Sequence, residues 1–194
     1  MKIVTILAVG LAYLLGSLPT GVWLSRRLSG EDIREIGDGN SGARNVTHML
    51  GWKAGIAVGL VDFSKGALAV FIAQKLDLTS GWQLAAGISA VFGHDFPLFA
   101  RFRGGQGMAT SLGTMGILFP YETLFGLLLF GLIYLITRNF DPSAAAGLGT
   151  LVFLLWRNRW PNFFLVYAVA LFLSIPLKKF LDYRYRYIKN IHVI

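Results

Sequence analysis

Long apolar runs, interrupted by short polar segments rich in glycine, constrain this sequence of 194 residues more than any other feature. Three segments carry Asn, Arg, Lys and His side chains: residues 37–45, residues 62–66 and residues 93–107. In lipid, a polar or ionisable group is costly unless it faces the interior of a helix bundle or a water-filled cavity. Three such segments in a small membrane protein therefore indicate a functional site, and their side chains favour anionic ligands.

The composition excludes an ordinary soluble domain. Hydrophobic residues make up 55% of the chain and charged residues 14%, and the mean hydropathy is +0.59, which is typical of a helical membrane protein with several spans. A β-barrel is disfavoured because the apolar stretches are continuous rather than alternating. The absence of cysteine excludes disulfides, a thiolate nucleophile and a sulfur-ligated metal.

Seven runs with few or no charges predict seven transmembrane helices. They cover residues 3–25, 54–74, 82–99, 107–121, 123–137, 142–156 and 160–177. Several are shorter than the roughly 20 residues that a perpendicular crossing needs. Because the chain has no long linker and no internal repeat, residues 1–194 are predicted to form a single membrane-embedded domain. The predicted fold class is an all-α polytopic membrane protein.

The distribution of Lys and Arg predicts the orientation of these helices. With the N-terminus outside, residues 26–53, 100–106, 138–141 and the tail from residue 178 lie on the cytoplasmic side and contain 13 of the 18 Lys and Arg residues. This asymmetry follows the positive-inside rule. The polar segments and the C-terminus are then cytoplasmic, and membrane topology and anionic lipids explain the net charge of +8 better than nucleic acid does.

The first polar segment, residues 37–45, contains three glycines, two asparagines and Arg44. Glycine permits a close approach of the backbone, so successive N–H groups can converge on an oxyanion, and Arg44 can offer a planar fork of donors to a phosphate. The alternative is a tight cytoplasmic turn in which Asn40 or Ser41 is a helix cap. The segment alone leaves both interpretations open.

Asp62 and Lys65 lie three residues apart in a helical run and therefore share one helix face. One interpretation is a buried ion pair that joins two helices, although such a pair is costly to bury without further partners. The other is a lysine beside an anion-binding pocket, oriented by the aspartate. Both interpretations place the two charges inside the membrane region.

The third polar segment ends in Gly104-Gly105-Gln106-Gly107, directly before a predicted helix over residues 108–119. A glycine loop that opens a helix is a ready anion site, because free N–H groups and the positive end of the helix dipole point at the ligand. The same segment contains His94. A lone histidine is more often a structural hydrogen bonder than a base, but its neighbour Asp95 in a membrane protein favours a functional role.

Five motifs follow one another along the first 115 residues. They are Tyr13-Leu14-Leu15-Gly16-Ser17-Leu18-Pro19-Thr20-Gly21, Gly37-x-Gly39-Asn40-x-Gly42-Ala43-x-Asn45-Val46, Asp62-Phe63-x-Lys65-Gly66, Gly93-His94-x-Phe96-Pro97-x-Phe99 and Gly104-Gly105-x-Gly107-x-Ala109-Thr110-Ser111-Leu112-Gly113. In this order and at this spacing, the motifs resemble those of the bacterial acyl-phosphate-dependent glycerol-3-phosphate acyltransferases, the PlsY family.

The resemblance implies a seven-helix enzyme of the bacterial inner membrane that works in phospholipid synthesis. Such an enzyme transfers a fatty acyl group from acyl phosphate to the 1-hydroxyl of glycerol 3-phosphate, releases phosphate and leaves 1-acylglycerol 3-phosphate in the bilayer. Acyl phosphate is already an activated anhydride, so no metal or cofactor is expected. The expected partners are the two substrates and membrane lipids, and no nucleic acid.

The expected site residues fall into two groups. Asp62 and His94 are expected to orient other groups or to handle a proton, unless a bound phosphate itself accepts the hydroxyl proton. Substrate binding is expected from Asn40, Ser41, Arg44, Asn45, Lys65, Arg103, Gly104, Gly105, Gln106 and Ser143. For Ser143, which follows Pro142, a helix cap is the alternative.

Three residues that the family pattern leads us to expect near the substrates are missing: Asp38 replaces a serine, Gln106 a lysine and Tyr185 a histidine. Arg44 stands where the family has threonine and is expected to compensate for the lost lysine, and Ser41 for the lost hydroxyl. These differences leave two alternatives to an enzyme. The first is a non-catalytic paralogue that binds acyl phosphate or lipid phosphate as a regulator, and the second is a transporter of a phosphorylated solute. Inverted repeats would favour transport, and the sequence contains none.

Overall fold

The computed structural model describes residues 2–191, and the side chains of residues 2–185. The α-helices of the described residues are α1 (Lys2–Gly16), α2 (Thr20–Ser29), α3 (Ala43–Leu50), α4 (Trp52–Lys75), α5 (Ser80–Asp95), α6 (Met108–Leu118), α7 (Pro120–Thr137), α8 (Phe140–Arg157) and α9 (Asn162–Ile191). Two 3-10 helices, η1 (Ile33–Glu35) and η2 (Leu98–Ala100), lie in the loops. The predicted all-α fold is confirmed.

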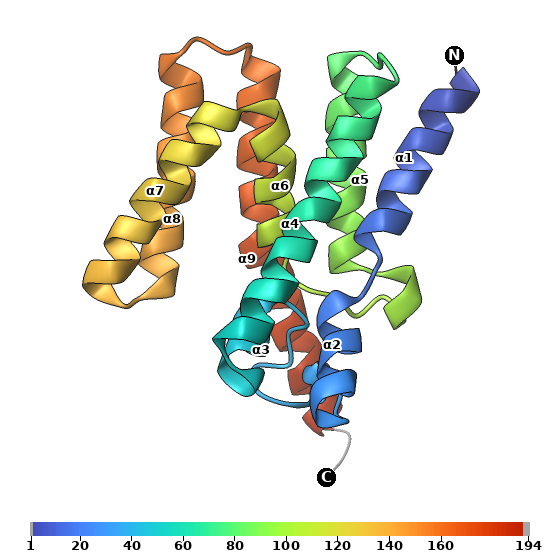
Figure 1. Ribbon diagram of the computed structural model, residues 1–194, viewed down its shortest axis with the longest axis vertical. Coiled ribbons are helices and arrows are strands. Elements are labelled where there is room, and N and C mark those ends of the chain that lie inside the picture. Colours follow the sequence, from blue (N-terminus) through green and yellow to red (C-terminus); the bar gives the residue numbers. More distant parts are fainter. Residues whose placement is uncertain (1, 192–194) are drawn as a thin grey trace.

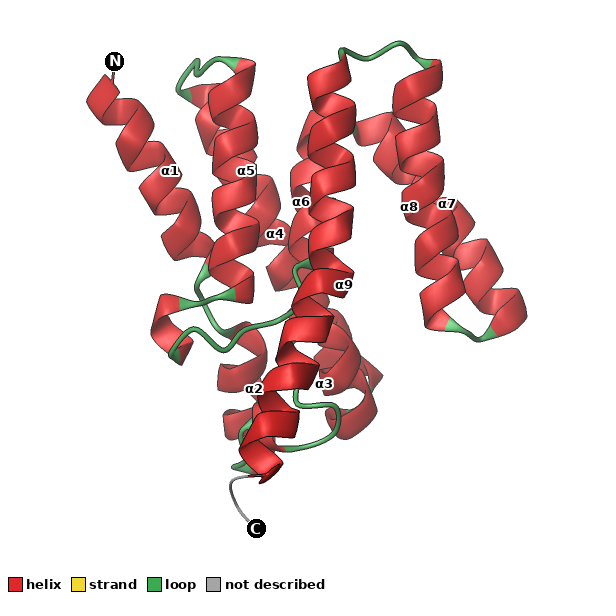
Figure 2. Ribbon diagram, turned by 180° about the vertical axis from the view of Figure 1, so that it is seen from behind, coloured by secondary structure: helices red, strands yellow, loops and turns green. Residues whose placement is uncertain are grey.

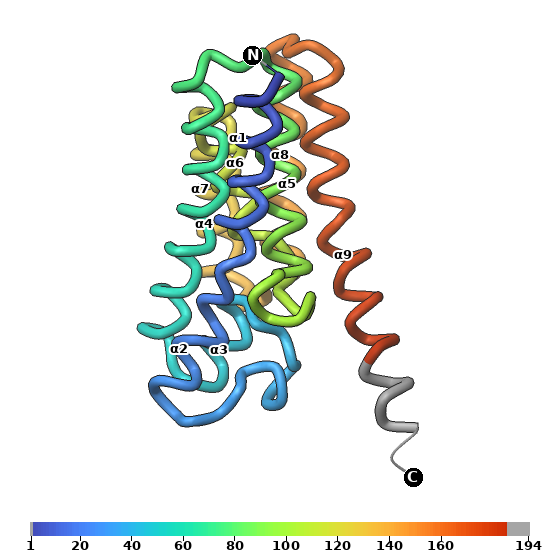
Figure 3. The backbone as a smooth tube through the Cα atoms, turned by 90° about the vertical axis from the view of Figure 1, so that its right-hand side faces the viewer, coloured from blue at the N-terminus to red at the C-terminus, as the bar shows by residue number. Residues whose placement is uncertain are grey.

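Most of the long helices run along the long axis of the molecule (Figure 1). The N-terminus and the connections α4–α5 and α8–α9 lie at one end, and α2, α3 and the C-terminal part of α9 lie toward the other. Helices α7 and α8 form a pair at one side of the bundle (Figure 2). In the side view, α9 lies on the opposite side of the bundle from α4 (Figure 3).

Four stretches of the described chain are long and apolar enough to cross a membrane. They are Lys2–Ser29, Trp52–Lys75, Pro120–Thr137 and Asn162–Tyr185. The molecule is therefore an integral, multi-pass membrane protein. Helix α6 is apolar but has only 11 residues, and α5 has 16, so length and composition alone do not mark these predicted spans.

Prolines set the boundaries at which the observed helices differ from the predicted runs. The run 3–25 is not one helix, because α1 ends at Gly16 and Pro19, which has no N–H to donate, directly precedes α2. The run 82–99 ends early, since a residue before proline avoids the helical region, and Phe96 before Pro97 has φ −128°. Pro120 is the first residue of α7, a favoured position for proline.

Glycines let pairs of helices approach to backbone contact. A Cβ atom at Gly66 of α4 would lie 2.0 Å from the carbonyl oxygen of Thr110 in α6, and one at Gly113 of α6 would lie 1.9 Å from that of Phe63 in α4. Small residues commonly allow such close packing between membrane helices. In lipid, the hydrophobic effect does not drive helices together, so their association relies on close contact. The close α4–α6 contact positions Asp62 and Lys65, which lie in the same part of α4.

Replacing Gly66 by alanine should destabilise the fold. The added methyl group overlaps a carbonyl of α6 that cannot rotate away, so we expect a loss of about 1–3 kcal/mol, measured by thermal unfolding in detergent. The matched control is Gly131→Ala in α7, where a Cβ atom meets nothing within 4 Å. Equal unfolding temperatures for the two variants would contradict the close α4–α6 contact.

Candidate functional site

A buried cluster of charged side chains lies beside the break between α1 and α2. The ammonium group of Lys65 donates to a carboxylate oxygen of Asp62 at 2.6 Å and to the carbonyl oxygen of Leu18 at 2.5 Å. The side chains of Lys65 and Asp62 are only 4% and 3% exposed. His94 of α5 approaches from another side, with Nδ1 3.6 Å from the same Asp62 oxygen. The cluster therefore joins α4, α5 and the link between α1 and α2.

The position of Lys65 follows from the helix break. Backbone carbonyls that lose their helical partners must be satisfied by other groups inside a membrane protein. The Lys65 ammonium does this for Leu18, and Asp62 balances its charge. The ion-pair interpretation therefore describes the geometry, but the same side chains also border a small cavity of about 10 Å³ together with Ser41 and His94. Lys65 therefore stabilises the helix break through its bond to Leu18 and also borders the small cavity.

The loop over residues 37–42 is organised by two asparagine side chains. The Asn45 oxygen accepts from the backbone N–H of Asp38, and its Nδ2 atom lies within 3.0 Å of three loop carbonyls, those of Ile33, Ile36 and Asn40. The Asn40 oxygen accepts from the N–H of Gly42 at 2.6 Å. These bonds occupy the polar atoms of Asn45, so the turn interpretation describes this segment. Both asparagines shape the loop that presents Ser41.

Gly104 and Gly105 do not form the expected anion cradle. Their N–H groups donate to the carbonyl oxygens of Asp95 and His94, at 3.2 and 3.1 Å. A Cβ atom at Gly105 would lie 2.1 Å from Nε2 of His94, and one at Gly104 would lie 2.0 Å from the His94 carbonyl oxygen. Glycine is therefore needed here because the loop packs directly against His94, which it holds in place. Gln106 follows, half-buried, directly before the Gly107 cap of α6.

The structure does not gather Arg44, Lys65 and Arg103 around one cavity. Arg44 forms an ion pair with Asp141 of α8 at 2.8 Å, and its guanidinium lies 4.9 Å from the ring centroid of Phe140. Arg44 does not border the small cavity at Lys65. It also does not border a second, larger cavity, which is lined by Arg103 and described below. Each cation instead pairs with its own nearby carboxylate, so the expected single cleft of three cations is wrong for this state of the molecule.

Two further expected residues have local partners. The hydroxyl of Ser143 is fully buried and donates to the carbonyl of Asn139 at 2.6 Å, which is a bond within the first turn of α8 rather than a cap. Tyr185, at the position of the family histidine, lies with its ring 5.5 Å from the Arg103 guanidinium. A cation over an aromatic face is a favourable contact. Arg103 also pairs with Glu35 at 3.1 Å.

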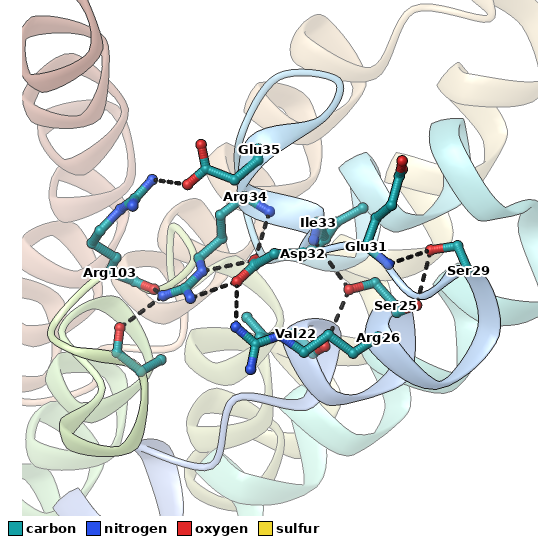
Figure 4. Close-up of polar contacts among 11 residues, drawn as sticks. Val22, Ser25, Arg26, Ser29, Glu31, Asp32, Ile33, Arg34, Glu35 and Arg103 are labelled. Carbon is teal, nitrogen blue, oxygen red and sulfur yellow. Dashed lines mark hydrogen bonds and ion pairs between the residues drawn. The ribbon is translucent and has the colours of Figure 1, made fainter. Parts of the chain in front are cut away.

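A second cavity, of about 370 Å³, lies beside the first, and Pro19 borders both. Its floor is an ion pair that sequence reasoning missed: Arg34 donates to both oxygens of Asp32, at 2.9 and 2.7 Å. Arg34 also donates to the carbonyls of Ala100 and Arg103, which ties η1 to the α5–α6 loop (Figure 4). The only sequence feature that could have indicated this ion pair is the spacing of Asp32 and Arg34, two residues apart in the polar stretch 31–35.

Asp32 and Arg34 shift each other's pKa in opposite directions. Hydrogen bonds from Arg34 hold the pKa of Asp32 well below its ordinary value, against the opposing effect of burial. The hydrogen bond to Asp32 in turn raises the pKa of Arg34. Both groups therefore stay charged throughout the physiological pH range, and it is Arg34 that links the two loops, through the carbonyls of Ala100 and Arg103.

Removing one charge of the buried pair should cost more stability than removing both. We expect Lys65→Met to destabilise the fold by about 3–5 kcal/mol, because it leaves the Asp62 carboxylate buried without its cation. The double variant Asp62→Asn, Lys65→Met should recover most of that loss, as thermal unfolding in detergent will show. A double variant as unstable as the single one would mean that the Leu18 contact of Lys65, rather than charge balance, dominates.

Comparison with known proteins gives consistent matches along most of the chain. The family model described as glycerol-3-phosphate acyltransferase matches residues 6–193. Glycerol-3-phosphate acyltransferase 1 of Dehalococcoides mccartyi is 39% identical over 180 residues, which cover 90% of this chain and 86% of that relative. Its namesake in Deinococcus radiodurans is 39% identical over 174 residues, or 88% of this chain and 87% of that protein.

Solved structures agree with this result. The crystal structure of PlsY, an integral membrane glycerol 3-phosphate acyltransferase, in its glycerol 3-phosphate form has a TM-score of 0.81 and 33% identity, and the match covers 97% of this chain and 90% of that one. The lysophosphatidic acid form has a TM-score of 0.80 and 31% identity, covering 90% and 87%. The predicted activity, an acyltransferase of phospholipid synthesis, is confirmed. The chain belongs to the glycerol-3-phosphate acyltransferase family.

Proposed function

We propose that this chain transfers an acyl group from acyl phosphate to the 1-hydroxyl of glycerol 3-phosphate at the place where Ser41, Asp62, Lys65 and His94 meet. The observation that carries the proposal is the buried Lys65 ammonium, which borders an opening together with the side chains of Ser41, Asp62 and His94. A cation at this depth suits a phosphate-bearing substrate, because a low-dielectric surrounding strengthens its attraction for an anion. The donor and the acceptor both carry phosphate.

The reaction depends more on how the protein positions the two substrates than on acid, base or nucleophilic groups of the protein. The 1-hydroxyl oxygen attacks the acyl carbonyl carbon, the bond from that carbon to the phosphate oxygen breaks, and the acyl group is left on glycerol 3-phosphate. The hydroxyl proton leaves with the phosphate. Because the donor is an activated anhydride, the main tasks are to align the two substrates and to stabilise the negative charge of the departing phosphate. No cofactor takes part in this scheme.

The residues have distinct roles in the proposal. Lys65 offers its charge to the phosphate, and Ser41 offers a hydroxyl from the adjacent loop. Asp62 orients both Lys65 and His94, which it approaches at 2.6 and 3.6 Å. His94 is proposed to contact the reacting groups, since its ring borders the opening. Asn40, Asn45, Gly104 and Gly105 are positioning residues, because their polar groups serve the loops around the opening.

The remaining expected ligands lie farther out, and their roles depend on movement. A cavity of about 10 Å³ holds about one water molecule and no substrate. Substrate entry therefore requires the α2–α3 loop and the α5–α6 loop to separate. This movement breaks the bonds from Arg34 to the carbonyls of Ala100 and Arg103 and the Arg103–Glu35 pair, and it frees Arg103 and Gln106 for contact. Ser143 belongs to α8, and Arg44 pairs with Asp141 of the same helix. We propose that both residues meet the substrate only after the exposed Arg44–Asp141 pair opens.

The proposed membrane arrangement has seven crossings, by α1, α4, α5, α6, α7, α8 and α9. The N-terminus is then outside the cell and the C-terminus cytoplasmic, in the inner membrane of a bacterium. Supporting this, the loops that carry most of the Lys and Arg residues lie toward the end where α2 and α3 are found (Figure 1). The active site would face the cytoplasm, within a single domain of 194 residues.

The decisive experiment is a turnover assay on the purified chain with acyl phosphate and glycerol 3-phosphate. The native protein should form lysophosphatidate and inorganic phosphate, and Lys65→Ala should lower kcat/KM by about 100- to 1000-fold, the usual effect of losing one electrostatic donor. Lys53→Ala is the control, since Lys53 is an exposed lysine at the start of the same helix.

Two results would change the conclusion. Near-native turnover by Lys65→Ala would mean that the active site does not lie at the cluster of Ser41, Asp62, Lys65 and His94. Protection of the native protein from unfolding by either substrate, without any product, would indicate the non-catalytic binding paralogue that Asp38, Gln106 and Tyr185 bring into consideration. The charge-balanced variant Asp62→Asn, Lys65→Met should be inactive although folded, which separates loss of chemistry from loss of structure.

A further inference from the structure

The cavity of about 370 Å³ carries an excess of positive charge. Four arginines border it, Arg26, Arg34, Arg101 and Arg103, against two carboxylates, Asp32 and Glu35. The side-chain charges around the cavity therefore leave a net of about two positive charges. Its volume lies within the range of small-ligand sites. A site of this composition attracts an anion.

The four arginines are not equivalent. The side chain of Arg34 is 11% exposed, and four acceptors surround it, so it belongs to the floor. Arg26 and Arg103 each hold one ion pair, and their side chains are 58% and 34% exposed. Exposed ion pairs are weak, so a doubly charged ligand can take over part of their bonding. Within the part of the chain that the structure describes, no hydrogen bond or ion pair engages Arg101.

The backbone presents Arg101 outward. Residue 101 is left-handed, with φ 55° and ψ 42°, and follows η2 directly. The structure thus places an exposed cation at the rim of the cavity at some conformational cost, because non-glycine residues rarely adopt this region. Arg34 fixes the same loop through its bonds to the carbonyls of Ala100 and Arg103 (Figure 4). The loop conformation therefore depends on Arg34, while Arg101 itself remains available.

Large apolar side chains flank the arginines. Trp23 of α2 and Phe99 of η2 border the cavity, and both are more than half exposed, as is Phe102. Aromatic residues beside Lys and Arg are typical of the boundary between lipid tails and headgroups. The cavity thus combines exposed aromatic side chains that suit alkyl chains with accessible arginines that suit a phosphate group.

We propose that this cavity binds the phosphate monoester headgroup of a membrane lipid, with Arg101, Arg103 and Arg26 around the phosphate and the lipid chains against Trp23 and Phe99. The cavity lies beside the Asp62–Lys65–His94 cluster and shares Pro19 with the small cavity there, and Arg103 is the one arginine here that the proposed function also uses. Lipid binding in this cavity goes beyond acyl transfer. A soluble phosphate monoester has the same headgroup chemistry, but it would leave the exposed aromatic rim without a role. The lipid is therefore the ligand that fits both halves of the cavity.

The test uses phosphatidate, a diacylated lipid that is neither substrate nor product of the proposed reaction. Native mass spectrometry of the full chain in detergent should show phosphatidate bound in preference to phosphatidylcholine. Arg101→Gln should weaken binding about tenfold, which corresponds to one charge-assisted contact, and Arg101→Lys should restore much of it. The matched control is Arg138→Gln, an exposed arginine that is also left-handed, with φ 53°, and it should change binding less than about twofold.

Several outcomes would overturn the proposal. Equal phosphatidate binding by the native chain, Arg101→Gln and Arg138→Gln would mean that the lipid binds elsewhere. Displacement of phosphatidate by equimolar glycerol 3-phosphate or inorganic phosphate would make the ligand a soluble phosphate. Equal binding of phosphatidylcholine would mean that the aromatic rim alone captures lipid. Unfolding temperatures of the variants, compared with the native value, establish that Arg101→Gln is folded.

Discussion

The contact between the Lys65 ammonium, the Leu18 carbonyl and the Asp62 carboxylate is the interaction on which the rest of the structure depends. Buried charges and backbone carbonyls without helical partners both cost free energy in a membrane. Here Asp62 balances the charge of Lys65, and Lys65 donates to the Leu18 carbonyl at the helix break. The break lets α2 turn away from the axis of α1, which makes room for the loops that carry Ser41 and Pro97. Because His94 contacts the same carboxylate, α5 and its glycine loop are held to this point as well.

This arrangement gives the family reaction a physical basis. In the proposed function, the lysine whose ion pair with Asp62 joins the helices also meets a substrate phosphate, and its burial means that little further desolvation is needed. The glycines at 104 and 105 pack against His94, and their N–H groups bond to backbone carbonyls. In the proposed mechanism, catalysis comes from fixed charges and aligned substrates, which agrees with a donor that is already activated and with a chain that lacks cysteine.

The sequence was most informative where a feature is local. Hydropathy predicted the all-α membrane fold, the spacing of Asp62 and Lys65 predicted their shared face, and the glycines before Met108 marked the start of α6. It was least informative about partners distant along the chain. Nothing near Arg44 indicates that Asp141, 97 residues away, will bind it, and spacing does not say that the N–H groups of the glycine loop will be taken by the carbonyls of residues 94 and 95.

In the proposed function, Lys65 contacts the substrate phosphate while it still bonds to the Leu18 carbonyl at the helix break. Solid-state NMR of the chain in bilayers, labelled with ¹⁵N-lysine and loaded with a non-hydrolysable acyl phosphonate, measures this contact as a ¹⁵N–³¹P dipolar coupling, assigned with Lys65→Arg. We expect a coupling for Lys65 that corresponds to direct contact, about 4 Å between nitrogen and phosphorus. A bound phosphonate that couples to other lysines but not to Lys65 would contradict it.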